Sequence, residues 1–210
     1  MELVHDIVRD SGRYSHITFT DSGALTKISR DTRKKLFKYV YDSFDILSVN
    51  EIELSQLYEA VCGYKASATP HVMLSSLLEK AKNLKMIWMH SRVANTCLWK
   101  KEFLPVEIVE KAQMFASVAG AIRVETGKYP EKESVLKRIK KIDFYEDGIE
   151  YIKKSSKASD EICPDYYINT VPSIKSNSFE TEVGAGDTAC AAFTYMLSSL
   201  TAPDTGAARR

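Results

Sequence analysis

The sequence lacks several features that would assign it to a specialised class. Its cysteines number only four and stand apart from one another, so no CxxC pair indicates a zinc knuckle or a thioredoxin-type redox motif. They are Cys62, Cys97, Cys163 and Cys190. Single cysteines among aliphatic neighbours predict buried, reduced thiols, which are typical of a cytoplasmic protein. No run of about 18 apolar residues predicts a transmembrane helix, and residues 1–6 are too polar for a signal peptide.

An excess of charge of one sign is also absent. The 29 Lys and Arg residues balance the 28 Asp and Glu residues, which leaves a formal net charge of +1. Such a chain has no bulk field that would attract nucleic acid or an anionic membrane, so neither is expected as a partner. The basic runs at 33–35 and 137–141 predict solvated helix faces. Oligomeric state is not predicted by any feature of the sequence.

Short apolar runs alternate with segments of helical periodicity along the chain. Strands are predicted at 13–20, 46–49, 85–90 and 165–173. Helices are predicted at 31–43, from Asn50 to about 61, and at 69–83, 105–121, 130–141, 145–154 and 189–200. The alternation favours an α/β fold with a mostly parallel sheet over residues 1–200. Residues 201–210 are rich in Pro, Gly and Ala and predict a flexible tail.

The segment 182–193, EVGAGDTACAAF, carries the sharpest chemical signal. Gly184, Ala185 and Gly186 precede a helix, where successive backbone N–H groups can approach an anion at the positive end of the helix dipole. Asp187 would be repulsive beside an anion unless it has a chemical task, and accepting a proton from a substrate hydroxyl is one such task. The alternative is that the glycines make a tight turn and Asp187 caps the helix.

The same segment fits the loose dinucleotide pattern GxGxxA through Gly184, Gly186 and Ala189. A dinucleotide fingerprint normally opens its domain, whereas this segment has no βαβ unit after it. A P-loop is absent, because no GxxxxGK[ST] occurs. A dinucleotide-dependent oxidoreductase therefore stays a third, weaker alternative to phosphoryl transfer.

Asn50 and Glu53 form a second group, at the end of the strand predicted at 46–49. Ligands of α/β proteins gather at the carboxyl ends of strands, and an amide oxygen with a carboxylate suits a hydrated Mg²⁺. The alternative is a helix start, with Asn50 as the N-cap and Glu53 three residues on, as in a capping box.

Together, NxxE and a later GxGD resemble the ribokinase-like superfamily, and within it the ADP-dependent glucokinase/phosphofructokinase family. Three stretches carry the resemblance, VNEIEL at 49–54, KMIWMHS at 85–91 and VPSIKSNSFETEVGAGD at 171–187. The resemblance implies a ribokinase-like layered α/β/α fold. It also implies Mg²⁺-dependent transfer of a phosphoryl group from ADP to a hydroxyl of glucose, fructose 6-phosphate or a related sugar, with AMP as product.

The family's site residues map onto matching positions of this sequence. The resemblance makes Asp187 the catalytic base and Gly184, Ala185 and Gly186 the anion hole around the transferring phosphoryl group. An ATP-dependent kinase of the same superfamily and a nucleotide-binding remnant without activity are the alternatives.

Further positions are implied on the metal and nucleotide sides. Glu53, with Asn50, would bind Mg²⁺ through water, and Val183, Gly186 and His90 would lie beside the nucleotide. A lone His after an apolar strand also fits a purely structural residue.

Two departures from the family pattern stand out. The family carries an HxE motif upstream of NxxE, but the matching stretch here has His16 and then Thr18 in place of the Glu, which implies a weaker metal site or a divergent subgroup. Family members are also considerably longer. The chain therefore resembles their C-terminal portion, without the N-terminal strands, most sugar contacts and the small lid domain.

Overall fold

The computed structural model of the chain describes residues 17–23, 27–63, 68–155 and 164–201. The strands are β1 (Phe19–Asp21), β2 (Ile46–Val49), β3 (Met86–His90), β4 (Ala94–Lys100) and β5 (Tyr166–Pro172). The helices are α2 (Arg30–Tyr39), α3 (Glu51–Cys62), α4 (Pro70–Lys80), α5 (Val106–Thr126), α6 (Lys132–Ile139), α7 (Glu146–Ser155) and α8 (Ala185–Thr201), with a 3₁₀ turn at Tyr41–Ser43.

The five strands form one sheet in the order β1-β2-β3-β4-β5. β1, β2 and β3 are parallel, and β4 is antiparallel to both β3 and β5, so β5 runs in the direction of β3. The predicted α/β fold with a mostly parallel sheet is confirmed. β1 and β5 are the edge strands of the described sheet.

The strand β4 was not expected from the sequence, because polar residues interrupt its apolar pattern. These residues are buried, but each has a partner. Asn95 donates to the Ser117 hydroxyl at 2.6 Å, and the hydroxyls of Thr96 and Thr170 lie 3.1 Å apart across the sheet. Buried polar groups are tolerated when they are hydrogen-bonded, so a strand with polar interior residues is stable here.

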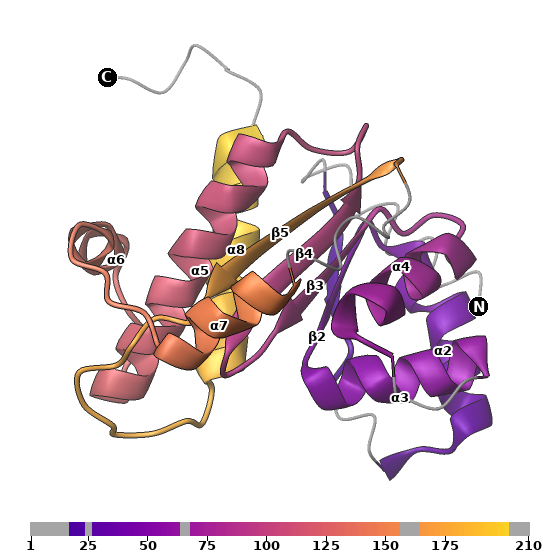
Figure 1. Cartoon of the computed structure of the whole chain (residues 1–210), viewed down its shortest axis with the longest axis horizontal. Helices are drawn as coiled ribbons and strands as arrows, with labels where there is room; N and C mark the ends of the chain where they lie inside the picture. The colour runs from indigo at the N-terminus through magenta and orange to yellow at the C-terminus, as the bar shows by residue number, and fades with distance from the viewer. Residues whose placement is uncertain (1–16, 24–26, 64–67, 156–163, 202–210) are drawn as a thin grey trace.

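Helices cover both faces of the sheet, and strand alternation separates the two cores (Figure 1). Leu47 and Val49 pack with Leu54, Leu57 and the other apolar residues of α2, α3 and α4. The alternate residues of the strands pack instead against α5 and α8. The layers are thus α/β/α, with α2, α3 and α4 on one side and α5 and α8 on the other (Figure 1).

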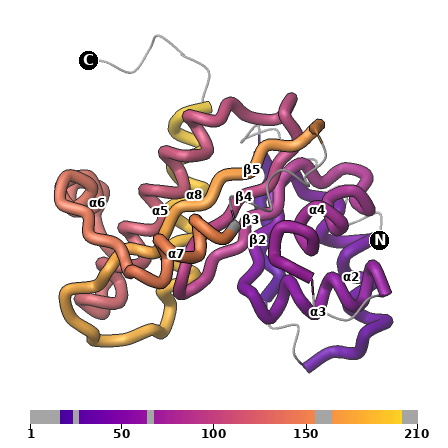
Figure 2. The backbone as a smooth tube through the Cα atoms, in the orientation of Figure 1, coloured from indigo at the N-terminus to yellow at the C-terminus, as the bar shows by residue number. Residues whose placement is uncertain are grey.

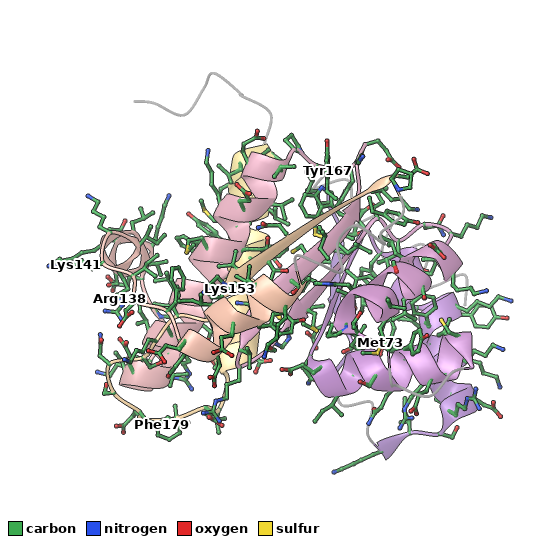
Figure 3. All side chains as sticks on the ribbon, viewed as in Figure 1. Met73, Arg138, Lys141, Lys153, Tyr167 and Phe179 are labelled. Atoms are coloured by element: carbon green, nitrogen blue, oxygen red, sulfur yellow. The ribbon has the colours of Figure 1, made fainter. Side chains whose placement is uncertain are left out.

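The loop between β5 and α8 passes the C-terminal end of α5 before it enters α8 (Figure 2). The Val124 carbonyl accepts from the N–H groups of Glu180 and Thr181 at 2.8 and 3.2 Å. The Glu125 carboxylate accepts from the Asn177 N–H at 2.7 Å and from Arg138 of α6 at 3.1 Å. Arg138 is labelled in Figure 3, as is the exposed Phe179 at the outer side of this loop. The path into α8 is therefore determined by the end of α5.

Several boundaries differ from the predicted ones. Ser29, rather than Asp31, is the N-cap of α2, because its hydroxyl accepts from the Thr32 N–H. Most importantly, α8 begins at Ala185 and not at Ala189, so Gly186 also lies in its first turn, where Asp187 was expected. In the described part of the chain, no helix is both long and apolar enough to cross a membrane. The predicted tail lies outside the described residues beyond Thr201, which ends α8.

Candidate active site

The carboxyl ends of three parallel strands place polar side chains next to one another on the face that α8 covers. In the sheet register, Asp21 of β1 pairs with Ser48 of β2, and Ser48 pairs with Trp88 of β3, two residues before His90. Residues two apart point to the same face of a strand. Asp21, Ser48 and His90 therefore end the apolar rows that pack against α8.

The first turns of α8 lie directly over this row. The Cys190 thiol is 3.1 Å from the Ser48 hydroxyl and 3.5 Å from Asp21 Oδ2. One turn further, Phe193 stacks on Trp88 with ring centroids 4.3 Å apart. This aromatic contact and the buried Phe193 side chain orient α8 on the sheet.

Gly186 allows the imidazole of His90 to approach α8. A Cβ atom at position 186 would lie 3.2 Å from His90 Cε1 and 3.7 Å from Nδ1. The other ring nitrogen, Nε2, is 4.0 Å from Asp21 Oδ2. His90 thus lies between the GAGD segment and the end of β1.

The GAGD segment forms a tight turn that leads into the first turn of α8. Gly184 has φ of 77°, the left-handed region that favours glycine. Its carbonyl accepts from both the N–H and the hydroxyl of Thr188, at 2.9 and 2.7 Å. The Ala185 N–H, which the resemblance placed in the anion hole, donates to the Glu182 carbonyl at 3.2 Å. In the described part of the chain, the N–H groups of Gly186 and Asp187 donate to no protein acceptor. They lie at the positive end of α8, and the carboxylate of Asp187 is exposed beside them.

Arg123, in the last turn of α5, fixes this turn from the other side. Its Nε donates to the Val183 carbonyl at 3.2 Å, and its guanidinium also donates to the Gly127 carbonyl. The guanidinium carbon lies 4.8 Å from the centre of the Tyr129 ring. Val183 itself is exposed, so its contribution to the described turn is the backbone carbonyl. Arg123 is a functional candidate that no sequence motif indicated.

Asn50 and Glu53 form the capping box that was the structural alternative. Asn50 Oδ1 accepts from the N–H groups of Ile52 and Glu53, both at 2.9 Å. Glu53 Oε2 accepts from the Asn50 N–H at 2.8 Å and from the Ser22 hydroxyl at 2.6 Å. The Tyr41 hydroxyl donates to the Ser22 carbonyl at 2.6 Å. The nearly buried Glu53 carboxylate is therefore held in one orientation.

Carboxylates of both motifs act on the imidazole of His90. Burial lowers the pKa of His90, while the carboxylates of Asp21, Glu53, Glu51 and Asp187 raise it to a smaller extent. Carboxylates from β1, from α3 and from α8 thus all lie near one imidazole. NxxE and GxGD, which are distant in the sequence, meet at this edge of the sheet.

The hydroxyl of Tyr41 and the thiol of Cys190, which lie near this edge of the sheet, are both uncharged at neutral pH. Burial raises the pKa of Tyr41 to about 12, with smaller contributions from Glu53 and Asp21. Burial is also the main cause that raises the pKa of Cys190 to about 12. Neither group can act as an anion in the free protein.

The donor set partly fits Mg²⁺, which prefers carboxylate oxygens and keeps several waters. In the described part of the chain, Glu53 Oε1 accepts no hydrogen bond and is available to a cation. The Asn50 oxygen already accepts two N–H groups, so it is a poor ligand in this conformation. Asp21, whose Oδ1 accepts from the Gly23 N–H at 2.9 Å, brings a second carboxylate to the same edge.

Thr18 lies at the opposite end of β1 from these carboxylates. Its N–H and hydroxyl both donate to Asp45 Oδ2 at 2.8 Å, at the amino ends of the strands. A Glu at position 18 would therefore point to the wrong edge, and His16 lies outside the described residues. Asp21 is the carboxylate that β1 contributes. The sequence could have indicated Asp21, because it lies directly at the end of an apolar strand.

No family model matches the sequence, and no curated protein matches it. Solved structures do match. The reconstructed last common ancestor of ADP-dependent phosphofructokinases from Methanosarcinales has a TM-score of 0.81 at 18% identity, over 93% of this chain and 45% of its own. An ADP-dependent kinase in complex with fructose-6-phosphate and ADPβS has a TM-score of 0.82 at 18% identity, over 96% of this chain and 49% of its own.

A phosphofructokinase from Pyrococcus horikoshii OT3 with AMP is also similar, with a TM-score of 0.70 at 18% identity over 85% of this chain. The chain spans between 41% and 49% of the length of these structures. The resemblance inferred from NxxE and GxGD, to a portion of the ADP-dependent kinases, is thus confirmed at the level of fold. This chain has the ribokinase-like fold of the ADP-dependent phosphofructokinases.

Proposed function

We propose that the chain binds a nucleoside diphosphate at the carboxyl edge of its sheet and contributes the catalytic base of an ADP-dependent sugar kinase. The observation that carries this proposal is the position of Asp187. Its exposed carboxylate lies in the first turn of α8, near His90 and next to N–H groups that have no acceptor among the described residues. An anion site and a proton acceptor side by side are what phosphoryl transfer to a hydroxyl requires.

In the proposed reaction the residues divide into three roles. The N–H groups of Gly186 and Asp187 stabilise charge on the transferring phosphoryl group. The carboxylate of Asp187 accepts the proton of the attacking sugar hydroxyl, as oxygen bonds to phosphorus and AMP leaves. Glu53 and Asp21 would bind Mg²⁺ through oxygen and water, and the ion would neutralise phosphate charge. Asn50 positions Glu53 through the capping box.

An apolar cavity beside the anion turn supports a nucleoside as the ligand. Its volume is about 370 Å³, and its lining includes Phe115, Tyr129, Thr188 and Tyr195. Thr188 also donates to the Gly184 carbonyl, so the cavity adjoins the turn. Aromatic side chains bind nucleobases by stacking. We propose that the base and ribose bind here while the phosphates reach Gly186, with Val183 and His90 on the nucleotide side.

The test compares Asp187→Asn with Asp147→Asn, an exposed acid in the first turn of α7. Nucleotide binding is measured by calorimetry with ADP and Mg²⁺, and transfer by AMP formation with glucose, fructose 6-phosphate and related sugars. Asp187→Asn should retain binding and lose about a hundredfold or more of the transfer rate, while Asp147→Asn retains both. Near-normal AMP formation by Asp187→Asn would show that Asp187 is not the base.

Two alternatives give different outcomes in the same assays. ADP formation from ATP, with no AMP from ADP, would indicate an ATP-dependent kinase of this fold. Nucleotide binding without transfer to any sugar would indicate a nucleotide-binding remnant. The free thiols of Cys62, Cys97 and Cys190 fit the reducing cytoplasm, which we propose as the location. Cys163 lies outside the described residues.

A further inference from the structure

Three side chains from distant parts of the chain lie close together at the edge of the site. One offers an oxygen, one a nitrogen and one a sulfur as a ligand atom. Asp21, His90 and Cys190 each offer one ligand atom, and these atoms all lie within 4.8 Å of one another. Asp21 ends β1, His90 ends β3, and Cys190 lies one turn after Gly186 in α8. We propose that this cluster is a binding site for zinc, which shares only Asp21 with the proposed Mg²⁺ site.

The distances between donor atoms are close to those of a zinc site. Bonds of about 2.0–2.3 Å in a tetrahedral arrangement place two ligand atoms about 3.3–3.8 Å apart. The Cys190 Sγ to Asp21 Oδ2 distance is 3.5 Å, and the His90 Nε2 to Asp21 Oδ2 distance is 4.0 Å. The Cys190 sulfur and the His90 nitrogen lie within 4.8 Å of each other, so side-chain movements of about 1 Å would bring all three donor atoms to tetrahedral distances.

The surroundings of each ligand fit the same role. Gly186 lies against His90 Cε1, so the ring presents Nε2 to Asp21. The Ser48 hydroxyl lies 3.1 Å from the Cys190 sulfur, where it can donate to a thiolate. Such outer contacts orient ligands and strengthen metal binding. Cys190 is buried and His90 nearly so, whereas Asp21 is partly exposed and leaves a path for the ion.

The chemical type of the donors selects the ion. A nitrogen, a sulfur and one carboxylate suit zinc and similar transition metals, whereas Mg²⁺ prefers oxygen alone. Three protein ligands leave the fourth position to water or to a phosphate oxygen. The carboxylates of Glu53, Glu51 and Asp187 add negative charge near His90, which favours a divalent cation.

One consequence rests on the proposed function. Zinc in this cluster would occupy Asp21, a proposed Mg²⁺ ligand, and would fill space beside Gly186. Zinc would therefore lower the affinity for the nucleotide with Mg²⁺. Zinc binding itself is tested without nucleotide, so failure of the zinc site and failure of the kinase proposal give separate results.

The experiment titrates zinc into the full chain after treatment with a chelator. A thiol coordinates only as the thiolate, so each ion should release the Cys190 proton, which calorimetry in two buffers of different protonation enthalpy detects. Cobalt in place of zinc should give the thiolate-to-cobalt charge-transfer absorption in the near ultraviolet.

Cys190→Ser and Asp21→Asn should each lower zinc affinity by on the order of tenfold or more, and Cys190→Ser should also remove the thiolate absorption. The matched control is Cys62→Ser, a half-buried thiol at the end of α3, which should change neither. Asp21→Asn is a change at a partly exposed side chain and keeps the test valid if Cys190→Ser folds poorly. Absence of zinc binding in the unaltered chain would overturn the proposal. So would a zinc affinity of Cys190→Ser and Asp21→Asn equal to that of the unaltered chain.

Discussion

Gly184 and Gly186 stand two residues apart, but the structure gives them different reasons to be glycine. Gly184 has φ of 77°, where a residue with a Cβ atom is strained. Gly186 has no such conformation, and only the close approach of His90 restricts a side chain there. Alanine at the two positions should therefore have unequal effects on the free energy of unfolding.

The magnitudes follow from the local geometry. At position 184 a Cβ atom would meet Arg123 only at 3.5 Å, an ordinary contact, so the cost of Gly184→Ala is the backbone strain of about 1–2 kcal/mol. At position 186 the His90 ring must move by a few tenths of an ångström. Alanine gains about 0.5–1 kcal/mol over glycine within a helix, which offsets that cost. Gly186→Ala should thus change stability by less than about 1 kcal/mol.

The assay is unfolding by urea at 25 °C, followed by circular dichroism, with thermal unfolding as a second measure. For a chain of this size, Gly184→Ala should lower the Tm by about 2–4 °C per kcal/mol lost. Gly184→Asn serves as a control, because Asn tolerates the left-handed region better than Ala, and it should recover part of the loss. Equal stability of Gly184→Ala and the unaltered chain, or a larger loss in Gly186→Ala, would refute the reasoning.

Two further predictions concern the core and the response to pH. Phe193→Ala should lower the free energy of unfolding by about 3–5 kcal/mol, because the ring is buried and stacked on Trp88. As a control, Phe179→Ala changes an exposed side chain and should alter the free energy of unfolding by less than about 0.5 kcal/mol. Urea unfolding measures both variants, and similar losses would contradict the packing. Tyr41 has its pKa raised to about 12, so the unfolded chain loses this proton first, and stability should fall between pH 10 and 12 by up to about 2–3 kcal/mol. Tyr41→Phe should lose the hydrogen bond to the Ser22 carbonyl but show a smaller alkaline fall; an unchanged fall would assign the effect to other groups.

Local patterns predicted most of the elements. The apolar run of β2 that ends at Asn50, and the helical period that follows it, are strong local signals. The strand β4 was missed because its stability depends on Gln113 and Ser117 of α5, which bond to its polar residues. Partners from a distant helix leave no periodicity in the strand itself.

The candidate site also contains residues that local motifs predicted and residues whose roles depend on distant segments. Gly184, Gly186 and Asp187 could be found because the motif is contiguous and its chemistry follows from the residue types. For Asn50 and Glu53, the capping box that the sequence offered as the alternative is formed, while Mg²⁺ binding stays a prediction. In the described part of the chain, one Glu53 oxygen accepts no hydrogen bond. Arg123 could not be found, because its role depends on a carbonyl sixty residues away.

By itself, the sequence determined the α/β alternation, the glycine turn with its acid and the resemblance to a portion of the ADP-dependent kinases. These features depend on residues that are neighbours along the chain. Only the tertiary structure decided that Asp21, and not Thr18 at the other end of β1, lies beside His90 and Cys190. The physical reason is that strand register and helix packing bring these side chains together, and both depend on contacts between segments far apart in the sequence.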